Sequence, residues 1–241
     1  MSHPPEHRGP APKDERLFGA KAQPVLQTAV AELSWLLDRG YAIRSGAVLV
    51  GDRHCLTDRQ RQSVARCACA QAAVQARRRR CVDLSQLRGR ELWLDGFNVL
   101  TILESALAGG VILVGRDGCL RDVAGVHRRY RKVQETLPVL EHLGALSQEW
   151  GVGALRWWLD EPVSNSGRLR SLILDLAASS GWPWQVDLVP NPDRVLSRCS
   201  QIVATSDCVI LDRCERWVNL AGAVIAARIP QSRLVDLGGV A

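Results

Sequence analysis

From residue 91 onward, short apolar runs alternate with stretches in which apolar residues recur every three or four positions. The apolar runs cover residues 92–94, 154–159, 185–189, 201–204 and 223–229. Helical periodicity follows Asn98 and recurs over 126–150 (with a break near Pro138), over 166–179, and over 192–199 with Asn191 as N-cap. This alternation predicts βαβ units, and hence a parallel sheet in a three-layer α/β domain. Glycine turns at 109–110 and 117–118 predict an inserted β-hairpin or flap.

The first 90 residues follow a different, mainly helical pattern. Residues 24–39 carry apolar side chains on one face, with Pro24 in the first turn and Gly40 at the expected end. A short strand is expected at 47–50. The capping-box pattern of Thr57 and Gln60 then opens a second helix that should end near Arg80. We therefore expect a disordered tail over 1–21, a small helical domain over 22–88 and an α/β domain over 89–241.

The charge is unevenly distributed between these two parts. Residues 1–90 hold 16 Arg and Lys against 8 Asp and Glu, whereas residues 91–241 hold 15 against 17. A basic module beside a slightly acidic one favours an anionic partner such as a nucleic acid. The stretch LTDRQRQSVAR faintly resembles the start of a helix-turn-helix, but a packed helix pair with a solvated basic face is the favoured interpretation.

Other features of the sequence narrow the class of protein. No apolar run reaches the roughly 18 residues of a membrane helix, and the N-terminal residues lack the apolar segment of a secretory signal. The eight cysteines include no CxxC pair, so we expect reduced thiols in a cytoplasmic protein. The nucleotide-binding patterns GxxxxGK[ST] and GxGxxG do not occur.

Acidic residues follow most of the apolar runs. Asp95 ends the first run, Asp160 the second, Asp193 opens the helix after the third, and Asp207 and Asp212 follow the fourth. Because ligands of open parallel sheets bind beyond the carboxyl ends of the strands, we expect these side chains to converge. Such a cluster repels itself unless a cation neutralises it, and carboxylates suit Mg²⁺ or Mn²⁺. Gly96 would permit the tight turn after Asp95, and Asn98 would hold a water or a phosphate oxygen.

Three short motifs carry a family resemblance. LDGFNVL, NPDRVL and IVATSDCVILD resemble the motifs of PIN-like nuclease domains of the NYN branch, and DRGYAIRSGAVLVGDRHCLT resembles the signature of domain of unknown function 434. The resemblance implies a PIN-like α/β domain in which Asp95, Asp193 and Asp207 bind the metal. It also matches Asn98 and Thr205 to the polar positions of the motifs. Asp160 and Asp212 are further candidates from strand position alone. The acid that PIN domains carry in the second helical region has three candidates here: Glu104, Asp117 and Asp122.

The leading hypothesis is a metal-dependent ribonuclease that hydrolyses phosphodiesters of single-stranded or structured RNA. The basic run over 128–132 and the N-terminal arginines would hold the RNA backbone, and Ser164 and Asn165 would donate hydrogen bonds to phosphates. The substrate-binding candidates are thus Ser164, Asn165, Thr205, Arg128, Arg129 and Arg131. A non-catalytic RNA-binding or scaffolding protein on the same fold is the alternative. An aspartyl phosphatase is disfavoured because the second acid that this chemistry requires is replaced by Phe97, and Lys132 is the only lysine after residue 90.

Overall fold

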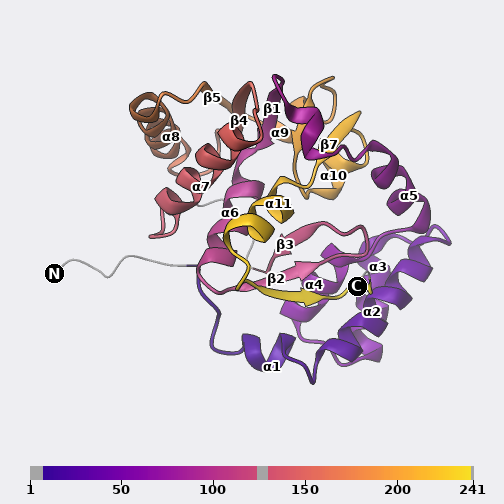
Figure 1. The fold of residues 1–241 in the computed structure, drawn as a ribbon. Helices are drawn as coiled ribbons and strands as arrows, with labels where there is room; N and C mark the ends of the chain where they lie inside the picture. Colours follow the sequence, from indigo (N-terminus) through magenta and orange to yellow (C-terminus); the bar gives the residue numbers. More distant parts are fainter. Residues whose placement is uncertain (1–7, 124–129, 240–241) are drawn as a thin grey trace.

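Five short strands form a parallel sheet in the C-terminal part of the chain (Figure 1). The computed structural model describes residues 8–123 and 130–239. The strands are β1 (Glu91–Asp95), β4 (Ala154–Asp160), β5 (Trp184–Val189), β6 (Ile202–Ala204) and β7 (Arg216–Val218), in the order β5-β4-β1-β6-β7. All neighbours pair in parallel. The predicted mixed α/β fold with a parallel sheet is confirmed.

Helices cover both faces of this sheet, because side chains along each strand alternate between two apolar clusters. Leu92 and Leu94 pack with α6 (Gly96–Leu107), α7 (Thr136–Glu149), α8 (Ser166–Ser180) and α11 (Leu220–Arg228). Trp93, Val203 and Trp217 point to the other face, which α9 (Pro192–Leu196) and α10 (Cys208–Leu211) cover. The chain therefore builds three layers, as the alternating pattern predicted.

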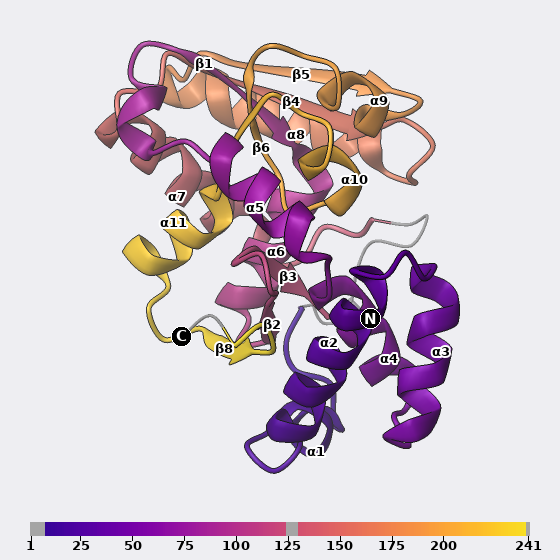
Figure 2. The ribbon, with the colours of Figure 1, turned by 90° about the vertical axis from the view of Figure 1, so that its right-hand side faces the viewer.

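A second, smaller sheet joins the N-terminal helices to this domain. The predicted hairpin is present as β2 (Val111–Val114) and antiparallel β3 (Leu120–Asp122), and β8 (Arg233–Asp236) adds to β2 in parallel. Helices α1 (Asp14–Phe18), α2 (Gln23–Leu37), α3 (Ile43–Arg53) and α4 (Asp58–Cys67) share an apolar core with Val111, Leu113 and Val235. Figure 2 shows the small sheet between these helices and the five-stranded sheet. The hairpin is thus part of a packed core.

Several expectations for the N-terminal part are wrong in detail. Residues 47–50 lie in helix α3, where Gly46 lets the helix pack closely on α2; a Cβ there would lie 2.7 Å from Leu33 Cδ1. The single helix expected from Thr57 to Arg80 is two, α4 and α5 (Gln71–Arg80), although the capping box is confirmed. Arg116 fixes the break, since its side chain donates to the Cys69 carbonyl at 2.7 Å. Helix α1 lies within the expected disordered tail, because Phe18 is buried there.

The C-terminal elements also show where local pattern misleads. The apolar run 223–229 is mostly helix α11, which starts after Asn219 because the side chain of Asn219 accepts a hydrogen bond from Gly222 N. Pro138 lies in the first turn of α7 and breaks no helix, while residues 126–129 of the expected long helix lie outside the described residues. Helices α8 and α9 are confirmed, with Asn191 as the N-cap of α9, which ends at Leu196.

A 3₁₀ helix (Leu84–Leu87) leads into β1. Within the described residues, no helix is both long and apolar enough to cross a membrane.

A buried ion-pair network connects α5, the β2–β3 turn and α10. Both Oδ atoms of Asp117 accept hydrogen bonds from Arg121, at 2.7 and 2.8 Å, and Arg77 binds Asp117 Oδ2 at 2.5 Å. Arg77 also binds Asp212 at 2.7 Å. Burial alone would raise the pKa of Asp117, but the hydrogen bonds and charges of Arg121 and Arg77 outweigh it and lower the pKa to about 2.

Asp117→Asn should therefore destabilise the protein by about 3–5 kcal/mol, because it leaves two buried guanidinium groups short of a counter-charge. Urea denaturation at neutral pH measures this difference. Asp212→Asn is the matched control: its carboxylate is about half exposed, so the expected loss is about 1 kcal/mol or less. Equal losses in the two variants would contradict a dominant role for Asp117.

Candidate functional site

The polar side chains of interest lie where the strand order reverses. From β1 the chain proceeds outward on one side through β4 and β5, and then returns to place β6 and β7 on the other side of β1. The segments leaving β1 and β6 therefore diverge at the carboxyl ends of these strands, which is where open α/β sheets bind ligands; we call the region between Asp95 and residues 205–207 the crevice. Asp95 is the last residue of β1, and Thr205, Ser206 and Asp207 directly follow β6.

Hydrogen bonds hold the two sides of this crevice in register. The Thr205 hydroxyl donates to Asp95 Oδ2 at 2.7 Å and accepts from the Asp207 backbone N–H at 3.0 Å. Asn98 Oδ1 accepts from the Ser206 backbone N–H at 2.8 Å. Thr205 and Asn98 therefore fix the position of the Asp95 carboxylate relative to the backbone after β6.

Gly96 serves close packing and not the expected tight turn. Its φ is not in the left-handed region, and it is the first residue of α6. A Cβ at this position would lie 2.5 Å from Leu159 Cδ2 and 3.0 Å from the Trp158 carbonyl oxygen. Only glycine lets α6 begin this close to β4, directly after Asp95.

Burial and neighbouring charges shape the protonation of Asp95. Its side chain is only 7% exposed. Burial raises the pKa of Asp95, and the Thr205 hydrogen bond opposes this effect. The negative charges of Asp207, Asp193 and Asp160 raise the pKa further, to about 8. Burial and the charges of Asp207 and Asp160 also raise the pKa of Asp193, and burial raises that of Asp160. The negative charges of Asp207, Asp193 and Asp160 thus act on Asp95, and those of Asp207 and Asp160 act on Asp193.

Asp193 and Asp207 reach the crevice from short helices. Asp193 lies in the first turn of α9, and it is exposed. Asp207 is the N-cap of α10, where its Oδ1 accepts from Val209 N at 2.7 Å. A helix N-terminus favours a nearby negative charge, which partly offsets the repulsion among the acids.

Several of the predicted site residues do not lie at the crevice. Asp212 is paired with Arg77 and faces the buried ion-pair network. The three candidates for the additional acid of PIN domains are also bound by side chains of the chain itself. Glu104 accepts hydrogen bonds from Arg8, Tyr130 and Thr136. Asp117 accepts hydrogen bonds from Arg77 and Arg121, and Asp122 accepts one from Arg66. Arg128 and Arg129 lie outside the described residues. Ser164 is exposed in the loop after β4.

A basic pocket of about 380 Å³ lies beside the loop that follows β4. Its lining is Tyr130, Arg131, Lys132, Asn165, Arg168, Leu169 and Leu172. Asn165 adopts a left-handed conformation, and its side-chain amide donates to the Tyr130 carbonyl at 2.8 Å. Tyr130 also packs against Phe97, two residues after Asp95, with ring centroids 5.2 Å apart. Two predicted substrate-binding residues, Asn165 and Arg131, thus share one pocket connected by packing to the Asp95 end of β1.

Arg168 in this pocket was not predicted from the sequence. The only available signal was its place in the first turn of the helix that follows the Ser/Asn-rich loop. Charged residues in that position are ordinarily solvated, so the sequence alone does not distinguish Arg168 from other surface arginines.

The donor chemistry of the crevice suits a hard divalent cation. In the described part of the chain, no three His, Cys, Asp or Glu side chains are close enough to form a metal cluster. Mg²⁺, however, takes only one or two protein carboxylates and completes its shell with water. Asp95 and Asp207, which Thr205 connects through its two hydrogen bonds, are the candidates to hold such a cation.

Fold and site define an α/β protein with an acid-lined crevice at its topological switch point. The chain belongs to the family described as Domain of unknown function (DUF5616), whose model matches residues 84–223. Residues 25–80 match Protein of unknown function (DUF434), which confirms that resemblance. An uncharacterized protein of Methanocaldococcus jannaschii is 26% identical over 186 residues, covering 77% of this chain and 88% of the relative. No solved structure matches.

Asp95→Asn should stabilise the metal-free protein increasingly as the pH rises. Between the usual pKa of 3.8 and the folded value of about 8, the folded wild type keeps a proton that the unfolded chain releases. Wild-type stability therefore falls with rising pH across this window, by up to about 1.4 kcal/mol per pH unit. The variant cannot ionise and keeps a side-chain oxygen for Thr205. Urea denaturation in EDTA between about pH 5 and pH 8 measures the difference.

The control for this prediction is Asp175→Asn, which changes an exposed aspartate on α8. A pH dependence as steep in Asp175→Asn as in Asp95→Asn would show that the effect is not specific to the buried carboxylate. A pH-independent difference for Asp95→Asn would show that Asp95 ionises normally in the folded protein.

Proposed function

We propose that this protein is a metal-dependent ribonuclease with a PIN-like, NYN-type active site. The observation that carries the proposal is the buried Asp95 carboxylate, bound by Thr205 and surrounded by the charges of Asp160, Asp193 and Asp207. A protein that needs only a stable core has no use for such repulsion. The arrangement has a use if the crevice binds a cation.

In this proposal each residue has a distinct part. Asp95 and Asp207 bind Mg²⁺ or Mn²⁺, which when bound lowers the pKa of a water and stabilises negative charge on a phosphodiester. Asp160 and Asp193 hold and orient waters at the same edge. Thr205 and Asn98 position the acids through the hydrogen bonds that cross the crevice.

The basic pocket supports RNA as the substrate. Arg131, Lys132 and Arg168 surround an apolar floor made by Leu169 and Leu172. Cations hold phosphates without reading sequence, and an apolar floor accepts a base or a sugar. In this proposal a single strand held in the pocket presents a phosphodiester to Asp95, since Tyr130 of the pocket contacts Phe97, two residues after Asp95.

A second candidate is an RNA-binding protein that has no catalytic activity. The observation that favours it is the absence, in the part of the chain that the structure describes, of three ligand side chains already close enough to hold a metal. Such a protein would bind RNA with strong salt dependence and without any requirement for a divalent cation.

The proposed nuclease should cleave a labelled mixed-sequence RNA with Mn²⁺ or Mg²⁺ and not with EDTA. Asp95→Asn and Asp207→Asn should each lower the cleavage rate by about 100-fold or more, because each removes a charge from the reacting centre. Asparagine is also a good N-cap, so the fold around α10 should persist in the second variant.

Asp175→Asn serves again as the control and should cleave at the wild-type rate. Binding of RNA without cleavage in any metal, unaltered in the Asp95 and Asp207 variants, would decide for the non-catalytic alternative. Cleavage that survives EDTA or both substitutions would indicate a contaminating nuclease.

Removal of a cation from the basic pocket should weaken RNA binding without affecting the metal site. Lys132→Ala and Arg168→Ala should each reduce the slope of log affinity against log salt by about 0.7, which corresponds to one phosphate contact with single-stranded RNA. Fluorescence anisotropy at several salt concentrations measures this slope. The control is Arg228→Ala, in the last turn of α11, where Arg228 pairs with Glu149. If that variant changes the slope as much, binding is not localised to the pocket.

A further inference from the structure

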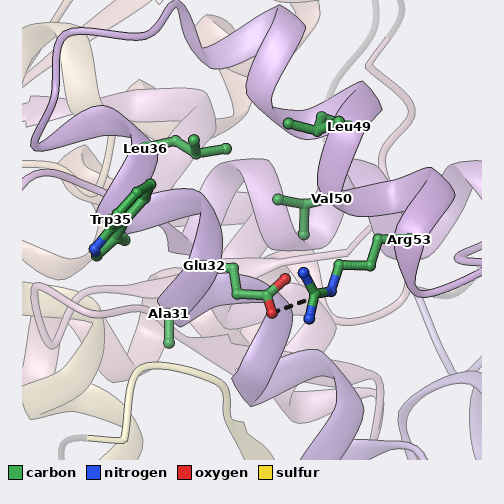
Figure 3. A pocket seen from close by; sticks show the side chains of 7 residues that line it. All are labelled: Ala31, Glu32, Trp35, Leu36, Leu49, Val50 and Arg53. Atoms are coloured by element: carbon green, nitrogen blue, oxygen red, sulfur yellow. Dashed lines mark ion pairs between the residues drawn. The ribbon is translucent and has the colours of Figure 1, made fainter.

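The lining of the basic pocket is positively charged. Three of its seven described residues are cations, Arg131, Lys132 and Arg168, and none of the seven is acidic. Neither Lys132 nor Arg168 forms an ion pair with another described residue. The hollow of about 600 Å³ between α2 and α3 differs, because its two charged lining residues, Glu32 and Arg53, pair with each other at 3.4 Å (Figure 3). The basic pocket therefore suits a ligand that brings negative charge.

The start of helix α8 forms one wall of this pocket. Its N-cap residue, Asn165, makes no side-chain cap, because the amide of Asn165 donates to the Tyr130 carbonyl at 2.8 Å instead. The first turn of α8 also contains no acidic residue. A Cβ at Gly167 would meet no atom within 4 Å, so a ligand has open space beside the backbone there. An anion in this place would accept hydrogen bonds from N–H groups that a capping side chain ordinarily satisfies.

The size of the pocket matches one nucleotide. Its volume of about 380 Å³ is near the lower end of the roughly 300–1,000 Å³ that small-molecule sites occupy. Leu169 and Leu172 supply an apolar surface for a base or a sugar, beside the cations that would hold a phosphate. A pocket of this size accepts the end of an RNA chain and not a run of several nucleotides.

We propose that the basic pocket binds a terminal phosphate monoester of RNA. Such a group carries a charge of about −1.5 to −2 near pH 7 and offers three acceptor oxygens, whereas an internal phosphodiester carries a single charge. Lys132, Arg168 and the uncapped start of α8 together match the more highly charged group. This inference rests on the proposed function in taking RNA as the ligand, and it does not depend on cleavage.

Fluorescence anisotropy with RNAs of one sequence tests the proposal. The RNAs carry a 5′-phosphate, a 3′-phosphate or hydroxyl groups at both ends, and EDTA prevents metal-dependent cleavage during the measurement. A phosphorylated RNA should bind about 10-fold more tightly than the RNA with two hydroxyl ends, because its terminal group adds charge-assisted hydrogen bonds. The RNA that gains affinity identifies which end the pocket binds.

Gly167→Asp should abolish this preference without harming the fold. The position has open space, its φ is not in the left-handed region, and an acid in the first turn of a helix is favourable. The new carboxylate would occupy the place of the phosphate and repel it. Gly167→Ala is the matched control, because it replaces the same glycine without adding charge, and it should keep the preference. Thermal unfolding verifies that both variants are folded.

The outcomes separate this inference from the proposed nuclease activity. Equal affinity of the wild type for all the RNAs would overturn the inference and leave the nuclease proposal standing. A preference that survives Gly167→Asp would also overturn it, since the phosphate would then bind elsewhere. A preference that Gly167→Asp abolishes and Gly167→Ala keeps would support the inference, even in a protein that cleaves no RNA with any metal.

Discussion

The architecture depends on the buried Asp117 carboxylate between Arg77 and Arg121. Arg77 belongs to the N-terminal helices, Asp117 to the turn of the inserted hairpin, and Arg77 also reaches Asp212 after the fourth parallel strand. The side chains of Asp117, Arg77 and Arg121 are buried, and none of them tolerates burial without the others, since an uncompensated buried charge costs several kcal/mol. The network therefore couples the small sheet, α5 and α10.

The buried carboxylate of the crevice, Asp95, has the opposite electrostatic surroundings to Asp117. Asp117 has two cations and a lowered pKa, whereas Asp95 has a hydroxyl donor, three like charges and a raised pKa. Both carboxylates are buried within the same domain, so the difference lies in the partners that the fold supplies. Arginines of the chain neutralise Asp117, whereas Asp95 is bound by the neutral hydroxyl of Thr205, and this difference is what motivates the proposed cation at Asp95.

The large sheet was predictable because buried parallel strands are continuous apolar runs, and the acids at their ends were predictable because those ends share one edge. The predictions that were wrong concern features that depend on residues far apart in the sequence. Arg77 precedes Asp212 by 135 positions, so no local pattern shows that Asp212 belongs to the network. The break between α4 and α5 depends on Arg116, and helix α3 depends on its packing against α2. β7 (Arg216–Val218) was missed because only two of its three residues are apolar and charged residues precede them, so no apolar run marks it.

The structure shows that many arginines in the basic first 90 residues are paired within the chain. At least five of its arginines form ion pairs with acids: Arg53, Arg59, Arg61, Arg66 and Arg77. Two of these pairs involve acids beyond residue 90. Part of the positive excess of the first 90 residues therefore offsets the negative excess of residues 91–241. Arginine suits this use because its planar guanidinium binds carboxylates in two directions and is weakly hydrated. These arginines are therefore structural, and the basic excess of the N-terminal part is not in itself evidence for an anionic partner.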